Sequence, residues 1–139
     1  MSNIITSGPF AVPLFIDGTS NLPVDRLLIG LKKPTDETKT VRVTVERLPD
    51  VVFPTTAPET VIPGFNRLQV SLLSEHFTII RIDTGPATFQ GGNWLRVTIE
   101  GDTDEEAEGI EVAFFGGNDG RPTVSMIFKH EDFIEVDED

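Results

Sequence analysis

The sequence predicts an all-β protein, folded as a two-sheet antiparallel β-sandwich of jelly-roll or immunoglobulin-like type. Short segments in which apolar and polar residues alternate recur along the 139 residues, and a period of two is typical of strands that bury one face. Turn residues separate these segments, and no segment shows a helical period. We expect roughly eight to ten strands in one domain, with a closed barrel as the second possibility.

Two isoleucines, Ile4 and Ile5, stand in a segment that we interpret as an N-terminal arm over residues 1–9. A strand is predicted over residues 10–16, because Phe10, Val12, Leu14 and Ile16 alternate with other residues. Phe15 gives this strand an apolar group on its other side, and Pro13 favours an edge position because proline cannot donate to a ladder. The sandwich domain is expected over residues 10–136, and an acidic tail over residues 137–139.

The middle of the chain contains three predicted strands, at residues 27–31, 41–45 and 68–72. Prolines are frequent in residues 49–64, which excludes a helix or a central strand there. We expect an extended crossing between the sheets, of the kind found in Greek-key sandwiches, with a short edge strand at residues 51–53.

Residues 77–82 form a further predicted strand, which is apolar on nearly both faces. A strand of this composition is typical of a central position in a sheet. The alternative is that another chain covers it.

The clearest alternation lies in residues 94–100 and 109–115, which we predict to form a hairpin around an acidic loop. Residues 116–122, GGNDGRP, give the strongest turn signal and are followed by a strand at 124–128. A last apolar patch contains Phe133, Ile134 and Val136. The predicted core consists of the alternating apolar residues: Val41, Val43, Val45, Leu68, Val70, Leu72, Leu95, Val97, Ile99, Ile110, Val112, Phe114, Val124, Met126 and Phe128.

The formal net charge is −12, and nearly all of the excess negative charge lies after residue 100. Nucleic acids and anionic membranes are therefore not expected as partners, because both require clustered Lys and Arg. Cations or a basic protein surface are the electrostatic partners that remain. The chain has no cysteine, which excludes disulfides, thiolate metal sites and thiol nucleophiles. We find neither a signal peptide at the N-terminus nor a run with the length of a membrane span.

The acidic loop is a candidate calcium site, because hard cations prefer several closely spaced carboxylate oxygens. Its spacing is not that of an EF-hand, and a solvated loop that blocks edge pairing explains the same residues. The candidate ligands are Asp102, Asp104, Glu105, Glu106 and Glu108.

Other chemistry has weaker support. His76 and His130, the only histidines, would form a zinc site only if folding brought them together with a carboxylate. Trp94 and ten Phe residues suggest a carbohydrate platform, but the chain lacks the Tyr that binding surfaces favour. No triad or nucleophile motif and no phosphate-binding glycine loop occurs. We therefore expect no catalytic residue, no cofactor and no enzymatic activity.

Two segments carry a resemblance to a known family: VIPGFNRLQVSL (residues 61–72) after the proline-rich crossing, and TIIRIDTG (residues 78–85) as a strand and turn. With the N-terminal arm, this order resembles the small jelly-roll subunits that build endospore appendages in Gram-positive bacteria. The resemblance implies an N-terminal connector and sheet edges that pair between neighbouring subunits. The connector of that family uses cysteines to cross-link subunits, and this chain has none.

These observations favour a non-enzymatic structural subunit that self-assembles by strand or edge complementation into a filament or surface array. Its expected partners are copies of itself, and a filament favours an extracellular, spore-surface or cell-surface location. The alternatives are a carbohydrate- or calcium-binding adhesion module and a viral capsid or tail accessory protein. The residues expected to be donated between subunits are Ile4, Ile5, Phe10, Val12, Leu14, Phe15 and Ile16.

Overall fold

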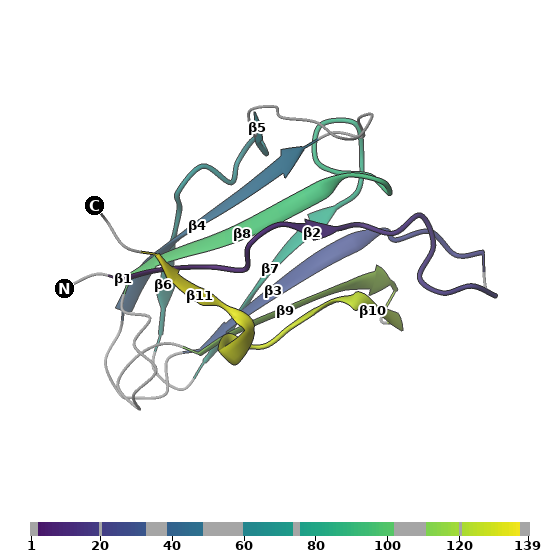
Figure 1. Ribbon diagram of the computed structural model, residues 1–139. Helices are drawn as coiled ribbons and strands as arrows, with labels where there is room; N and C mark the ends of the chain where they lie inside the picture. Colours follow the sequence, from purple (N-terminus) through teal and green to yellow (C-terminus); the bar gives the residue numbers. More distant parts are fainter. Residues whose placement is uncertain are drawn as a thin grey trace.

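The computed structural model describes residues 3–19, 21–32, 39–48, 60–73, 76–101, 111–119 and 121–136. This part of the chain contains eleven β-strands and one 3-10 helix, η1 (His130–Asp132), and no α-helix. The strands form two antiparallel sheets that pack against each other (Figure 1). The prediction of an all-β, two-sheet sandwich is therefore confirmed.

The larger sheet has seven strands. Their order is β11-β1-β8-β4-β5, while β2 also pairs with β8 and β6 also pairs with β4. The strands are β1 (Asn3–Thr6), β2 (Phe10–Ala11), β4 (Lys39–Leu48), β5 (Thr60–Val61), β6 (Leu68–Leu72), β8 (Trp94–Gly101) and β11 (Ile134–Val136).

The smaller sheet has four strands in the order β10-β9-β3-β7. They are β3 (Arg26–Lys32), β7 (Phe77–Asp83), β9 (Glu111–Asn118) and β10 (Arg121–Phe128). β3 is central, and its residues pair in unbroken register with β7 on one side and with β9 on the other. The chain passes between the two sheets several times, which is typical of Greek-key sandwiches rather than of meanders.

The core fills the space between the sheets. An aromatic cluster lies where β2 of the larger sheet approaches β10 of the smaller one: the rings of Phe114 and Phe128 stack with centroids 4.5 Å apart, and Phe10 lies 5.0 Å from Phe128. Phe133 meets Phe114 edge-on at 5.7 Å. Aromatic pairs at such distances add to the burial energy of each ring, so this cluster ties the two sheets together.

Most of the predicted core is confirmed. Leu68 is half-buried, and Val70 and Phe128 are partly buried but pack against the core. Ile110 and the side chain of Val124 lie outside the described residues. The predicted residues that are buried are Val41, Val43, Val45, Leu72, Leu95, Val97, Ile99, Val112, Phe114 and Met126.

The hairpin predicted from residues 94–100 and 109–115 is wrong. β8 pairs with β1, β2 and β4 in the larger sheet, whereas β9 pairs with β3 and β10 in the smaller one. Both strands bury one face against the same core, and a period of two identifies the buried face without identifying the neighbouring strand. At the turn predicted over residues 116–122, β9 and β10 pair with each other as a hairpin, with Asn118 opposite Arg121.

The interpretation of residues 1–9 as an arm is also corrected. β1 lies in the larger sheet, between β8 and β11, and Ile5 is buried in the core of its own chain. Ile5 faces the core beside Ile99, its partner in register. Burial of this side chain and the two ladders of hydrogen bonds explain why the segment belongs to the sheet.

The strand predicted over residues 10–16 is shorter than expected, because β2 ends at Ala11. Val12 continues with backbone hydrogen bonds to Asn93 and Gly92, but Pro13 follows and has no N–H to donate. Leu14 and Phe15 are 63% and 46% exposed, whereas Ile16 is buried. The short edge strand predicted at residues 51–53 lies outside the described residues.

The two-sided apolar composition of β7 had predicted a central position in a sheet. This prediction is wrong. β7 lies at an edge of the smaller sheet and pairs only with β3 among the described strands. The alternative, that another chain covers this strand, stays a prediction.

Candidate functional site

The most unusual surface of the described structure is the outer face of the four-stranded sheet. Along β3 and β9 buried residues alternate with more exposed ones, and the more exposed residues are those whose side chains point away from the core. We define the outer face by these outward residues of the four strands: Arg26, Leu28, Gly30, Lys32, Phe77, Ile79, Arg81, Asp83, Glu111, Ala113, Phe115 and Ile127.

The outer face exposes large apolar side chains. Phe77 and Ile79 on β7 are 73% and 66% exposed, Ile127 on β10 is 43% exposed and Phe115 on β9 is 37% exposed. Single exposed apolar residues are normal on soluble proteins, but a group of them on one sheet face is typical of an interaction site. The outer face is therefore the candidate functional site.

The corresponding face of the seven-stranded sheet carries ion pairs over its central strands β4 and β8. Arg96 of β8 forms an ion pair with Glu46 of β4 at 2.8 Å, and Arg67 pairs with Glu100 of β8 at 2.9 Å. Such cross-strand charged pairs are typical of an antiparallel sheet face in contact with water. The two outer faces thus differ: on the larger sheet the exposed large apolar residues of the described strands lie on β11 (Ile134 and Val136), whereas β7, β9 and β10 all expose them on the smaller sheet.

Gly30 lies at the middle of the outer face. It pairs with Ala113 on one side and with Ile79 on the other. The fold does not require a glycine here, because a Cβ atom on Gly30 would meet only the carbonyl oxygen of Ala113, at an ordinary 3.7 Å. Glycine inside a strand weakens it, and it often marks a site where a ligand or another chain approaches closely.

An open groove of ≈ 440 Å³ lies along the smaller sheet at Gly30. Its floor is formed by the small residues Gly30 and Ala113, and Phe77 forms one wall. The lining residues are Gly30, Leu31, Lys32, Phe77, Glu111, Val112, Ala113 and His130.

Two residues of opposite charge flank the groove. Lys32 of β3 and Glu111 of β9 are partners in register, and the ammonium group of Lys32 lies 4.7 Å from the centre of the Phe77 ring. This cation–π contact holds the lysine over the outer face. The groove end of the outer face therefore carries one positive and one negative group.

His130 continues the edge of the sheet beyond the end of β10. Its Nδ1 accepts a hydrogen bond from the backbone N–H of Val112 at 3.3 Å, in the place where a further β10 residue would pair. Because Nδ1 is the acceptor, a neutral His130 carries its proton on Nε2. That Nε2 atom is buried without a partner among the described residues. His130 thus has a structural role, as a cap of the ladder.

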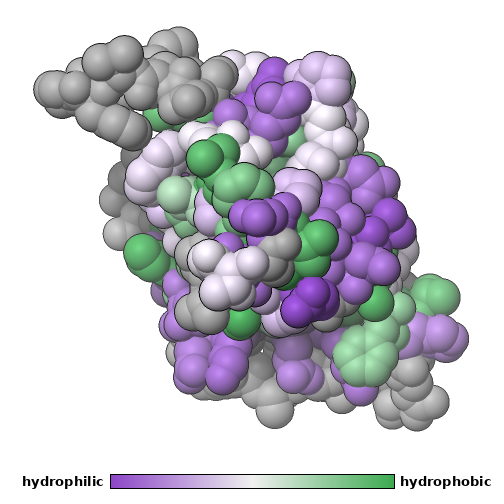
Figure 2. Space-filling view, turned by 90° about the vertical axis from the view of Figure 1, so that its right-hand side faces the viewer, coloured by the Kyte–Doolittle hydropathy of each residue, from purple (hydrophilic) through white to green (hydrophobic). Residues whose placement is uncertain are grey.

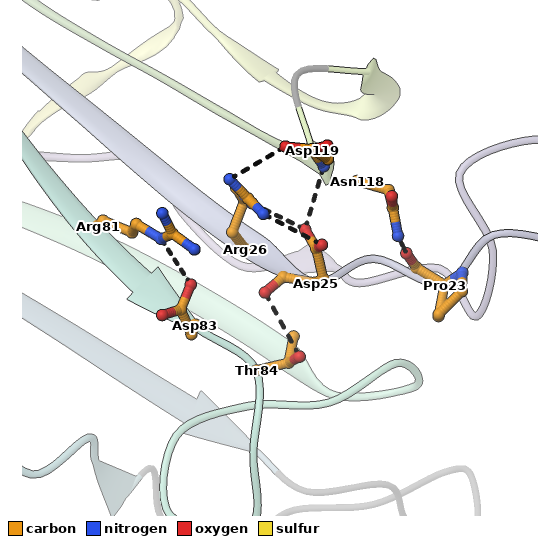
Figure 3. Close-up of polar contacts among 8 residues, drawn as sticks. All are labelled: Pro23, Asp25, Arg26, Arg81, Asp83, Thr84, Asn118 and Asp119. Atoms are coloured by element: carbon orange, nitrogen blue, oxygen red, sulfur yellow. Dashed lines mark hydrogen bonds and ion pairs between the residues drawn. The ribbon is translucent and has the colours of Figure 1, made fainter.

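A polar cluster closes the opposite end of the smaller sheet (Figure 3). Arg26 donates from Nε and Nη2 to the two carboxylate oxygens of Asp25, at 2.9 and 3.3 Å. The backbone N–H of Asp119, in the β9–β10 turn, donates to Asp25 Oδ1 at 3.3 Å. Thr84 N–H, after β7, donates to the Asp25 carbonyl at 3.0 Å. Asp25 thereby ties the turn and the end of β7 to the start of β3.

The electrostatics of this cluster match that structural role. The hydrogen bonds from Arg26 hold the pKa of the Asp25 carboxyl below its ordinary value, with a further contribution from the Asp119 N–H. Asp25 in turn raises the pKa of Arg26. Both groups stay charged at neutral pH and are paired with each other, so neither is available for acid–base chemistry.

The residues that the sequence singled out for metal binding do not form a site in the described structure. The candidate calcium ligands Asp102, Asp104, Glu105, Glu106 and Glu108 lie outside the described residues. His76 precedes β7 and His130 follows β10, so β3 and β9 lie between them. Among the described residues no group of three or more His, Asp or Glu side chains is placed to hold a metal ion.

The predicted assembly residues are distributed between core and surface. Ile5, Phe10, Val12 and Ile16 are buried in their own chain, and Ile4 is half-buried in β1. Only Leu14 and Phe15 are exposed, in the loop between β2 and β3. Figure 2 views the end of the molecule from which this loop projects, and there apolar residues stand as separate spots among hydrophilic ones.

The sequence matches no protein-family model, and no curated protein matches it. The described part of the chain contains no helix with the length and apolar character that a membrane span requires. Function is therefore inferred from the surface itself. Sequence reasoning found one part of it, the two-sided apolar strand at residues 77–82, but missed Leu28, Gly30, Phe115 and Ile127, which join it only through the strand order.

Proposed function

We propose that this protein is a non-enzymatic structural subunit that self-associates through the open edge of β7 to build a filament or surface array. The observation that carries this proposal is that β7 has an apolar face and one edge with which no other described strand pairs. A seven-residue edge strand with exposed Phe77 and Ile79 is the kind of edge that pairs with another chain unless something blocks it.

The direction of the backbone groups on β7 supports this role. Thr84 N–H points toward β3, where it donates to Asp25. Because backbone N–H groups alternate in direction along a strand, those of Ile80 and Ile82 also point toward β3. The N–H groups of Ile79 and Arg81 therefore point toward the open edge. A strand from a second copy would satisfy them by β-augmentation.

The donated segment differs from the one expected from sequence. Residues 3–6 already pair within their own sheet, so the donor in this proposal is an existing strand edge of another copy. Pairing of β7 with a second β7 closes after two copies, and growth beyond a dimer needs a second contact. Among the described strands, β11 lies at an edge of the larger sheet, and its Ile134 is 62% exposed. β11 is therefore our candidate for the second contact.

The proposal that the protein is not an enzyme is supported by the partners of its described polar side chains. In the cluster of Figure 3, Arg26 is paired with Asp25 and Arg81 with Asp83 at 2.7 Å. In the groove, His130 is committed to the Val112 backbone. No nucleophile–base pair is present among these described groups.

The proposal is tested with two substitutions at one edge position. Arg81→Pro removes the outward N–H of Arg81 and leaves the ladder with β3 intact, because proline is tolerated where the N–H faces solvent. Arg81→Ala is the matched control, since it removes the same side chain and keeps the N–H. We expect full-length protein and Arg81→Ala to form large assemblies by light scattering after gel filtration and by negative-stain imaging, and Arg81→Pro to lose them.

Equal assembly of Arg81→Pro and Arg81→Ala would exclude β7 as the edge that pairs. A full-length protein that stays monomeric at high concentration would reject the structural-subunit proposal altogether.

A further inference from the structure

We propose that the outer face of the four-stranded sheet packs against the same face of a second copy, about a twofold axis that runs between β3 and β9 and parallel to them. This inference rests on the proposed self-association and assigns it a surface other than the edges of β7 and β11. An isologous contact of this kind brings each β3 over the β9 of the other copy. Sheets that pack face to face lie about 10 Å apart.

The register between β3 and β9 determines which residues meet across the contact. Residues that are partners in register on β3 and β9 exchange places under this rotation, so each meets its own register partner from the other copy. Leu28 and Phe115 are such partners, and each apolar side chain would cover the other across the interface. Phe115 is 37% exposed in the single copy, and the contact would remove it from water.

The charges at the groove end favour the same arrangement. Lys32 and Glu111 are register partners, so Lys32 of each copy would face the partner subunit's Glu111. Two identical attractive contacts result, one on each side of the axis. A twofold axis perpendicular to the strands would instead place Lys32 near the partner's Arg26 and bring like charges together. Charge complementarity therefore selects the axis parallel to the strands.

Gly30 and Ala113 explain how two such faces can approach. They are also register partners, and both line the groove. Under the twofold rotation Gly30 of one copy faces Ala113 of the other, so this pair of residues causes no clash and leaves the larger side chains on either side to make the contact. The fold tolerates a side chain at Gly30, so the absence of one is explained by the interface.

The charge distribution of the whole chain also favours a second copy on this face. The net charge is −12, which opposes association over most of the surface. The outer face carries Arg26, Lys32 and Arg81 against Asp83 and Glu111, so it has no excess of negative charge. Two copies would therefore meet here without the repulsion that the rest of the chain imposes.

The test separates this contact from the β7 edge. In the Arg81→Pro protein, which lacks the edge contact, we expect dimers by sedimentation equilibrium. Arg81 belongs to β7, outside the register pairs of β3 and β9 that meet across the axis, and Arg81→Ala controls for the loss of its side chain from the outer face. Adding Gly30→Lys should convert them to monomers, because two ammonium groups would be buried near the axis without partners. Gln69→Lys, which adds the same charge at an exposed position on the larger sheet, is the control and should leave the dimer intact.

A charge exchange tests the pairing itself. Lys32→Glu and Glu111→Lys should each raise the dimer dissociation constant by about tenfold or more, and the two substitutions together should restore association. A dimer that resists both Gly30→Lys and the single charge reversals would overturn the face contact. If Arg81→Pro is monomeric while the wild type assembles, the face contact fails and the edge proposal stands. A monomeric wild type would reject both, and the face would then belong to a different partner.

Discussion

Two glycines in neighbouring strands of the smaller sheet show how differently single residues constrain this protein. Gly30 faces outward over a groove and has room for a side chain. Gly117 of β9 lies beside the turn into β10, where a Cβ atom would collide with the backbone carbonyl of Arg121 and approach the Pro122 Cα to 2.7 Å. Gly117 is therefore required by the fold, whereas Gly30 is not.

Alanine at these two positions should have opposite effects on stability. We expect Gly117→Ala to destabilise the protein by about 1–3 kcal/mol, because backbone must move to admit the methyl group. Gly30→Ala should be neutral or stabilising by about 0.5–1 kcal/mol, since glycine in a strand costs entropy. Urea unfolding of both variants measures the difference. A Gly117→Ala protein as stable as the wild type would show that the β9–β10 hairpin is not as tight as described.

The ion pair between Asp25 and Arg26 makes a pH-dependent contribution to stability. The pKa of Asp25 is lowered in the folded protein, so the charged carboxylate stabilises the fold at pH values above its ordinary pKa of 3.8. That contribution is lost as the pH falls through the lowered folded-state pKa. Asp25→Asn should therefore lower the unfolding midpoint at pH 7, and the difference from wild type should shrink below about pH 4.

The control for this prediction is Asp83→Asn. Asp83 and Arg81 are 61% and 53% exposed in their side chains, and ion pairs in solvent contribute little. Asp83→Asn should change the unfolding midpoint only slightly at either pH. A difference between Asp25→Asn and wild type that persists undiminished at pH 3 would show that Asp25 acts through its shape and not its charge.

At the scale of the strands, the sequence determines which face of each element is buried but not which strand lies beside it. Val97 and Val112 were both predicted to face the core and both do, although their strands lie in different sheets. The partner of a strand depends on contacts far along the chain, which a local period does not encode. The same limit explains why β7 was predicted as central and lies at an edge.

The candidate site follows the same rule. The apolar pattern of residues 77–82 indicated a strand that needs cover on both sides, and Phe77 and Ile79 are indeed exposed on an edge strand. Phe115 and Ile127 could not be assigned to this surface from sequence, because only the order β10-β9-β3-β7 brings them together with β7. Gly30 carried no local signal at all, since glycine in a strand has several possible causes.

For the molecule as a whole, the position of the N-terminal segment changes the expected effect of a truncation. As a free arm, residues 1–8 would be dispensable for folding, and their removal would release soluble monomers. In the structure β1 lies between β8 and β11, and Ile5 is buried. The Ser7 hydroxyl accepts a hydrogen bond from the backbone N–H of Val97 at 3.0 Å, and the backbone N–H of Ser7 donates to the carbonyl of Val97 at 2.9 Å.

Deletion of residues 1–8 should therefore weaken the fold and not only the assembly. The loss of β1 leaves residues 98–101 of β8 without their partner on one side and removes the only described partner of β11. It also opens the core at Ile99, which pairs with Ile5. Burying an isoleucine is worth about 1.5–3 kcal/mol, so we expect a lower melting temperature and a broader thermal transition by circular dichroism. The substitution Ile5→Ser, which keeps the backbone of β1, should give a smaller loss than the deletion. A truncated protein that melts at the wild-type temperature would restore the interpretation of residues 1–9 as an arm, and with it their availability for donation to a neighbouring subunit.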